Sequence, residues 1–289
     1  MSTRVALIVL AGVAALGLVT SSAGARRETL KGLIAYEKCM VPSRSHFCGS
    51  DIWVMRADGS HQRKLNLGRT SSDQDHAPVW SPDGKKIAFW REPKWLPDRD
   101  TIFITNADGT HVTRLARGNS PSWSPDGRSL VFQGPHGLYV VGADGGTVRK
   151  LAARGGMPDW SPDGERVVFS YSRPRGRSSL HVINIDGTHE RVLARGEAWN
   201  PKWSPNGDAI VYANWGGGWM LNVRSGHRTH LGNFPYGADL SWSPDGNQII
   251  WDQAADWPNA ELWVMNRDGS ERQRLTHTRL AEYAPDWTD

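Results

Sequence analysis

The stretch WSPDG at residues 80–84 decides the fold, because the chain repeats it at a nearly constant interval. It recurs as WSPDG at 123–127, 160–164 and 242–246, as WSPNG at 203–207, and in clipped form as PDWTD at 285–289. The six motif tryptophans are separated by 43, 37, 43, 39 and 45 residues. A period of this size indicates repeated structural units that stack on their neighbours to bury their apolar faces.

Each repeat contains turns and short strands. Ser-Pro-Asp-Gly suits a type I turn, with Pro fixing φ at the second position and Gly available for a left-handed residue or a bulge. Runs such as KKIAFW (85–90), after the motif, and LYVVGADGG (138–146), which ends in a DG turn, are rich in β-branched and aromatic residues. Such runs predict strands. The motif Trp lies at a strand end, where we expect it to pack against a neighbouring unit.

Four strands per unit and six units predict an all-β protein, a six-bladed β-propeller with four antiparallel strands in each blade. The first unit starts with a second strand in KGLIAYEK (31–38), and the last motif, APDWTD (284–289), is a first strand without successors. We therefore expect the C-terminal strand to join the N-terminal blade and close the ring, which removes an exposed sheet edge.

The five copies of WSP(D/N)G, each followed by a strand and an ADGT-like turn, resemble the TolB-type propeller repeat over residues 32–289. The resemblance implies a six-bladed ring that usually serves as a non-enzymatic binding scaffold in exported bacterial proteins. Only about six residues separate the expected export cleavage site from the first strand, whereas TolB carries an extra N-terminal domain. The resemblance is therefore taken to imply the fold and not the family's partners.

The N-terminus is typical of a secretory signal peptide over residues 1–25. MSTR (1–4) precedes the apolar or small residues 5–20, and Ala23-Gly24-Ala25 is a small-x-small cleavage site. An uncleaved anchor is the alternative, although this segment is short for a membrane span. We expect residues 26–289 to form the propeller domain of a secreted, periplasmic or cell-envelope monomer with no membrane span after cleavage. In an exported chain, Cys39 and Cys48 favour a disulfide.

The charge pattern and the missing motifs argue against several functions. The net charge is +4 and the isoelectric point is about 9.2, but no block of five like charges occurs, so no nucleic-acid partner is predicted. The sequence contains no G-x-S-x-G elbow, no H-E-x-x-H and no P-loop, and its ten histidines lack ligand spacing. We therefore predict neither a cofactor nor an enzyme.

Candidate ligand-binding residues lie in the connections opposite the motif turns, where propellers usually bind. The first group is an aromatic and basic rim: Trp95, Tyr171, Arg173, Arg175, Trp199, Trp215 and Trp257. Such a rim could stack on sugars or hold an acidic peptide. The alternative is that each aromatic ring only covers the end of its own blade.

The second group precedes the motif tryptophans and is expected at the channel mouth: Asp75, His76, Asn200, Asp239 and Tyr283, accompanied by Asn119 and Glu282. Carboxylates from different blades could hold calcium there, since hard oxygen ligands suit this ion. A water-filled polar channel is the alternative.

Three functional hypotheses follow. The first is a non-catalytic scaffold that recognises a protein or peptide partner at the cell envelope through its loop-rich face. The second is a carbohydrate-active lyase or hydrolase that uses channel carboxylates and His76. The third, should residues 1–25 remain attached, is the ectodomain of an anchored sensor.

Overall fold

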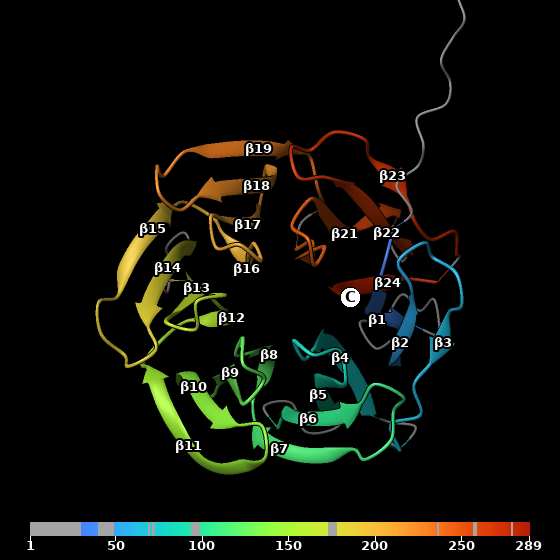
Figure 1. Ribbon diagram of the computed structural model, residues 1–289, viewed down its shortest axis with the longest axis horizontal. Helices are drawn as coiled ribbons and strands as arrows, with labels where there is room; N and C mark the ends of the chain where they lie inside the picture. The colour runs from blue at the N-terminus through green and yellow to red at the C-terminus, as the bar shows by residue number, and fades with distance from the viewer. Residues whose placement is uncertain are drawn as a thin grey trace, which may run out of the picture.

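Six four-stranded antiparallel sheets surround a central channel in the computed structural model (Figure 1). The structure describes residues 30–39, 49–68, 70, 73–93, 99–172, 178–235, 237–256, 259–278 and 280–289. This confirms the all-β, six-bladed architecture. Each sheet is a blade, numbered here in chain order, and its strands run from an inner strand at the channel to an outer strand at the wall.

The first three blades contain these strands, from the channel outward. Blade 1 consists of β24 (Glu282–Thr288), β1 (Leu33–Cys39), β2 (Ser50–Arg56) and β3 (Arg63–Lys64). Blade 2 consists of β4 (Asp73–Trp80), β5 (Lys86–Pro93), β6 (Thr101–Asn106) and β7 (Thr113–Arg117). Blade 3 consists of β8 (Asn119–Trp123), β9 (Ser129–Gly134), β10 (Gly137–Gly142) and β11 (Gly145–Ala152).

The other three blades repeat this order. Blade 4 consists of β12 (Gly156–Trp160), β13 (Arg166–Ser172), β14 (Ser178–Asn184) and β15 (Arg191–Arg195). Blade 5 consists of β16 (Trp199–Trp203), β17 (Ala209–Asn214), β18 (Gly217–Asn222) and β19 (Arg228–Gly232). Blade 6 consists of β20 (Leu240–Trp242), β21 (Gln248–Asp256), β22 (Asn259–Asn266) and β23 (Gln273–Arg274).

The C-terminal strand closes the ring as predicted. β24 pairs with β1 in an antiparallel ladder in which Leu33 faces Thr288 and Ile34 faces Trp287. The Trp287 indole Nε1 also donates a hydrogen bond to the Lys31 carbonyl at 2.8 Å. Blade 1 is therefore assembled from both ends of the chain.

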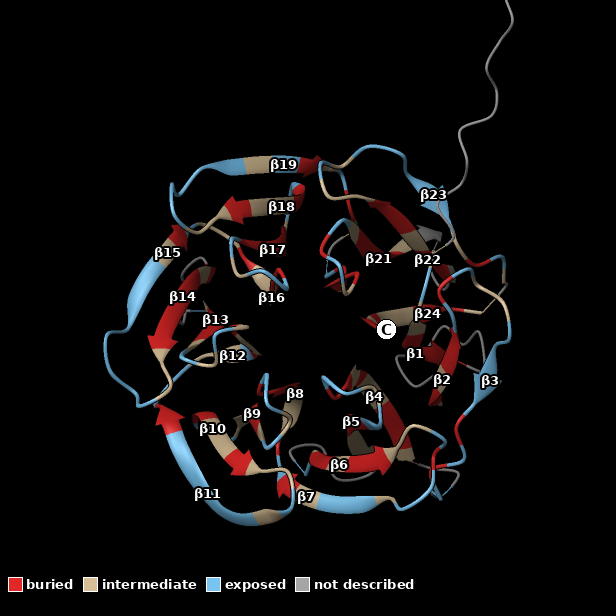
Figure 2. Cartoon of the chain, in the orientation of Figure 1, coloured by how far each residue is buried: buried red, intermediate tan, exposed pale blue. Residues whose placement is uncertain are grey.

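The apolar core lies between blades. One cluster joins Ile52 and Val54 of blade 1 to Trp80 and Phe89 of blade 2, and each of the other blade pairs is packed in the same way. All six motif tryptophans take part in these clusters, which confirms the expected packing against a neighbouring unit. Figure 2 shows the result, with buried strands inside and mostly exposed outer strands at the wall.

The motif turns have the predicted hydrogen bonds. In the first copy the Gly84 amide donates to the Ser81 carbonyl at 2.9 Å, and Gly84 has a φ of 66°. The Asp83 carboxylate accepts from the Ser81 hydroxyl at 2.7 Å, and this bond lowers the pKa of Asp83 below its usual value. The motif Asp residues therefore shape the turn, as their position in the sequence indicates.

Several predictions fall outside the described residues. Residues 1–25 and Cys48 are among them, so the signal peptide and the disulfide with Cys39 stay predictions; Cys39 itself lies at the end of β1 and is 4% exposed. Within the described part of the chain, no helix is long and apolar enough to cross a membrane.

Candidate functional site

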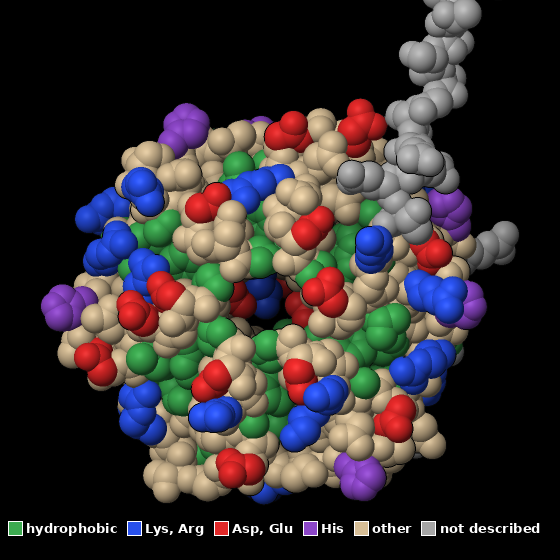
Figure 3. Space-filling model, viewed as in Figure 1, with side chains coloured by type: hydrophobic (Ala, Val, Ile, Leu, Met, Phe, Trp, Pro, Cys, Tyr) green, Lys and Arg blue, Asp and Glu red, His purple; other side chains and the backbone are tan. Residues whose placement is uncertain are grey.

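The two ends of the channel carry different groups. The motif end carries the WSPDG turns, and the loop end carries the connections between second and third strands and between successive blades. Figure 3 shows the motif end, where acidic side chains surround the central hollow; a basic side chain lies within the hollow, and other basic side chains lie further out.

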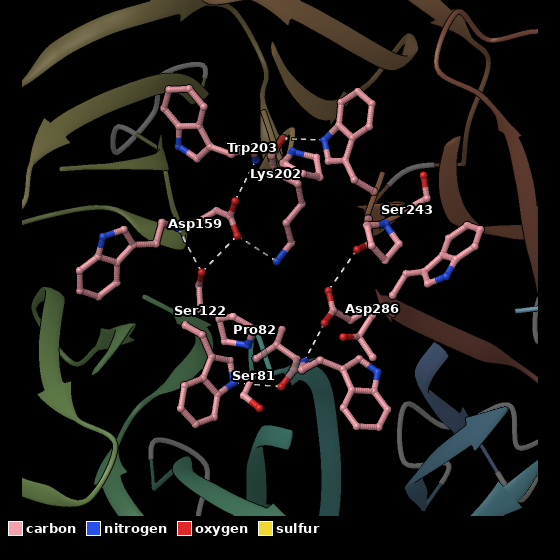
Figure 4. A pocket seen from close by; sticks show the side chains of 18 of the residues that line it. Ser81, Pro82, Ser122, Asp159, Lys202, Trp203, Ser243 and Asp286 are labelled. Carbon is pink, nitrogen blue, oxygen red and sulfur yellow. Dashed lines mark hydrogen bonds and ion pairs between the residues drawn. The ribbon is translucent and has the colours of Figure 1, made fainter. Parts of the chain in front are cut away.

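At the motif end, the residue before each motif Trp lines a cavity of about 370 Å³ (Figure 4). One side chain comes from each blade: Val79, Ser122, Asp159, Lys202, Ser241 and Asp286. Neighbouring blades thus contribute apolar, polar and charged groups to one small space.

A backbone irregularity accompanies these side chains. Five inner strands contain a non-glycine residue with φ between 43° and 51°, always three positions before the Trp: Ala77, Ser120, Met157, Asn200 and Ala284. The strand register shifts at the same place in each of these blades. Bulges of this kind turn the following side chains in a new direction. We attribute the inward position of the residue before Trp to this bulge.

Hydrogen bonds across blade boundaries fix the two acids. Asp286 accepts from the Trp80 amide at 2.7 Å and from the Ser241 hydroxyl at 3.0 Å. Asp159 accepts from the Trp203 amide at 2.8 Å and the Ser122 hydroxyl at 3.2 Å. Each acid therefore joins its own blade to both neighbours around the channel.

Lys202 places a cation between these acids. Its ammonium Nζ lies 3.4 Å from Asp159 Oδ1, and the side chain is 26% exposed. Burial lowers the pKa of Lys202, but the charges of Asp159, Asp286 and Asp239 outweigh it and raise the pKa above its usual value. Burial raises the pKa of both Asp159 and Asp286, and the Lys202 charge opposes that rise. The cation therefore remains protonated and favours the ionised form of both acids.

At the loop end, the structure brings three of the predicted rim aromatics together. Trp199 and Trp215 make an edge-to-face contact with ring centroids 5.4 Å apart, and Trp215 is 65% exposed. Tyr171 and Trp199 line one cavity of about 290 Å³, together with Met157. Trp215 lines a second cavity of about 460 Å³, beside Glu197. The cluster spans blades 4 and 5. The other rim predictions lie outside the described residues: Trp95, Arg173, Arg175 and Trp257.

Two predicted channel-mouth residues of β4 form salt bridges to neighbouring strands. Asp75 is 1% exposed and accepts two hydrogen bonds from the Arg91 guanidinium, at 2.6 and 3.0 Å. His76 Nδ1 lies 3.0 Å from Glu37 Oε1, its Nε2 lies 3.6 Å from Glu92 Oε2, and its ring stacks on Trp90. Burial lowers the pKa of His76, but the two glutamates outweigh it and raise the pKa to about 10.

The remaining predicted residues lie in blades 5, 6 and 1. Asn200 occupies the left-handed bulge position of β16, a conformation that Asn tolerates well, and its amide reaches the Ala238 carbonyl at 3.4 Å. The Asp239 amide donates to Asp252 Oδ1 at 2.5 Å. Burial and the Glu37 charge raise the pKa of Asp239 to about 7, opposed by Lys202. Burial, followed by the charges of Asp252 and Glu37, raises the pKa of Tyr283.

The described residues contain no group of three or more His, Cys, Asp or Glu side chains suited to hold a metal ion. Calcium in the channel therefore has no support from the carboxylates whose positions are described. Sequence reasoning also missed Asp159, Lys202 and Asp286. The available signal was the variable middle position of P-x-W, which differs in charge from copy to copy.

Comparisons with known proteins agree with this architecture. Residues 50–219 match the model of the TolB beta propeller domain family. The Tol-Pal system protein TolB of Anaeromyxobacter dehalogenans is 33% identical over 121 residues, a match covering 40% of this chain and only 28% of that protein. The same protein from Anaeromyxobacter sp. is 32% identical over 121 residues, with the same coverage of both chains.

Solved structures show the same fold. TolB from Acinetobacter baumannii superimposes with a TM-score of 0.76 at 19% identity, covering 89% of this chain and 66% of that one. Oligogalacturonate lyase from Vibrio parahaemolyticus gives 0.53 at 16% identity, covering 78% and 70%. With the family match extending over more than half of its residues, this chain belongs to the TolB beta propeller domain family.

Proposed function

We propose that this propeller is a non-catalytic scaffold that binds a protein or peptide partner through its loop end. The observation that carries the proposal is the Trp199–Trp215 pair, in which each ring lines a cavity and Trp215 is 65% exposed. Trp and Tyr side chains that project beside pockets are the usual anchors of protein interfaces, because they bury a large apolar area with few rotatable bonds. The relatives named Tol-Pal system protein TolB support a role in a multi-protein system.

We further propose that residues 1–25 direct export, that residues 26–289 form the mature domain, and that the protein acts as a monomer in the periplasm or cell envelope. The apolar N-terminal segment and the TolB relatives support this location. The intact mass of the protein recovered from the envelope fraction would show whether the chain starts at Arg26.

The lyase or hydrolase alternative is weaker. His76, the histidine of that hypothesis, is enclosed by Glu37, Glu92 and Trp90, and the elevated pKa keeps its imidazole protonated at neutral pH. A protonated imidazole cannot accept a proton from a substrate. The similarity to a solved lyase shows the fold alone.

The test is a selection of displayed peptides against the full chain, with acidic oligosaccharides assayed in parallel for binding and cleavage. We expect peptides to be selected and their affinity to fall about tenfold or more in Trp215→Ala, as for interface anchors. Arg128→Ala, an exposed residue of a motif turn, is the control and should bind normally. If none of the selected peptides loses affinity in Trp215→Ala, or if an oligosaccharide is turned over, the proposal is refuted.

A further inference from the structure

The outer strand of blade 3 differs from the other outer strands in length. β11 has eight residues, whereas β3, β7, β15, β19 and β23 have two to five. The sheet order β11-β10-β9-β8 leaves its outer side as an edge, and residues 146–150 are all exposed. Folded proteins usually keep exposed edge strands short, because their free amides and carbonyls can pair with another chain.

The charges on the outer strands have one sign. Although the chain has 34 basic and 30 acidic residues, these six strands contain ten basic residues and no Asp or Glu. They are Arg63, Lys64, Arg114, Arg117, Arg149, Lys150, Arg191, Arg195, Arg228 and Arg274, all exposed. Charged side chains of either sign would protect an edge from aggregation. A surface that carries basic groups and no acids is also complementary to an acidic ligand.

β11 carries basic groups on both of its faces. The Arg149 guanidinium reaches blade 4, where it donates to the Ile185 carbonyl at 2.8 Å. Lys150 lies on the opposite face, with its ammonium 5.9 Å from the Tyr139 ring, which packs against blade 2. Val148 is 44% exposed, and it lies in the stretch where the register between β10 and β11 shifts.

We infer that the outer edge of β11 binds an extended acidic segment of a protein partner, which adds to blade 3 as a fifth strand. Main-chain hydrogen bonds would supply affinity, and alternate side chains of the segment would meet Lys150 on one face and Arg149 on the other. A second copy of this chain is disfavoured as the occupant, because pairing β11 with itself would bring like charges together. This inference takes one premise from the proposed function, namely that the ligand is a segment of a protein.

The probe is a fluorescently labelled eight-residue peptide of alternating glutamate and valine, titrated into the full chain at low salt. We expect saturable binding, slower amide hydrogen exchange at residues 146–150, and no binding of the same peptide methylated on alternate backbone nitrogens. Lys150→Glu should weaken binding about tenfold or more. Arg228→Glu is the matched control, because Arg228 is also exposed on an outer strand and lies 5.9 Å from the Trp219 ring; it should bind as the unaltered protein does.

Strand addition would be overturned if the methylated peptide bound as tightly as the unmethylated one. It would also be overturned if Lys150→Glu and Arg228→Glu lost the same amount of affinity for the peptide, because general charge attraction would then explain the binding. Absence of binding would also overturn it. Far-UV circular dichroism must first show both variants folded. Trp215→Ala should retain this peptide, so a failure at β11 with intact loop-end binding refutes this inference and not the proposed function.

Discussion

At the residue scale, the most consequential group is Lys202, the one lysine among the described residues that line the motif-end cavity. Removing a charge from water is costly unless an opposite charge and hydrogen bonds replace the lost hydration. Lys202 meets Asp159 directly and acts on Asp286 through its charge, while amides and hydroxyls of neighbouring blades satisfy the carboxylates. The stability of the ring at this point therefore depends on one cation.

Lys202→Met should destabilise the protein by about 3 kcal/mol, because it leaves Asp159 without its counterion inside the channel. The double variant with Asp159→Asn should recover part of the loss, since no unpaired charge then remains at that contact. Urea unfolding of both variants measures the difference. Lys85→Met is the control, because Lys85 is 79% exposed and its contact with Asp83 is on the surface. A loss in Lys202→Met no larger than in Lys85→Met would contradict the assigned role.

The sequence allowed some of these residue roles to be predicted and not others. The turn-forming roles of Ser, Pro, Asp and Gly follow from local preferences, so they could be assigned correctly from the repeat. The meeting of Asp159, Lys202 and Asp286 depends on ring closure and on the inner-strand bulge, neither of which has a local signature at those positions. Asp75 and His76 were recognised as polar, but their salt bridges to Arg91 and Glu37 are contacts between strands.

At the element scale, the repeat was sufficient to predict the strands because each blade obeys the same turn chemistry. The inner-strand bulge was not predicted, since its left-handed position is filled by Ala, Ser, Met and Asn in different blades, and only Asn200 favours that conformation. The greater length of β11 was not predicted either, because nothing in the local composition around 145–152 distinguishes β11 from the shorter outer strands.

Removal of residues 281–289 should abolish cooperative folding, because it deletes β24 and exposes the inner edge of β1 together with the cluster around Ile34 and Tyr36. A milder variant keeps the test informative if the truncated chain is insoluble. Trp287→Ala retains the strand but removes its buried ring, and it should cost about 3–5 kcal/mol. Thermal unfolding followed by near-UV circular dichroism measures both. An unchanged transition in the truncated protein would show that the ring does not need this closure.

At the scale of the whole molecule, closure of the ring places acids from blades 1, 2 and 6 close enough at the loop end to shift the pKa values of neighbouring groups. Glu37 raises the pKa of Asp239 and also that of His76, although the two residues belong to blades on either side of blade 1. Burial and the Asp239 charge raise the pKa of Asp252 as well. Because the folded ring holds protons that the unfolded chain releases, its stability depends on pH.

Stability should fall as pH rises from about 4 to about 10. Asp239 has a folded pKa of about 7 against 3.8, so the folded state holds a proton that the unfolded chain releases, and this contribution is lost between those values. His76 has a folded pKa of about 10 against 6.5, so its contribution is complete below 6.5 and disappears by 10. Thermal unfolding at pH 5, 7 and 9 measures the fall. Asp239→Asn should flatten the acidic part of the curve and His76→Gln the alkaline part, whereas a midpoint that rises from pH 5 to 9 in the unaltered protein would contradict both assignments.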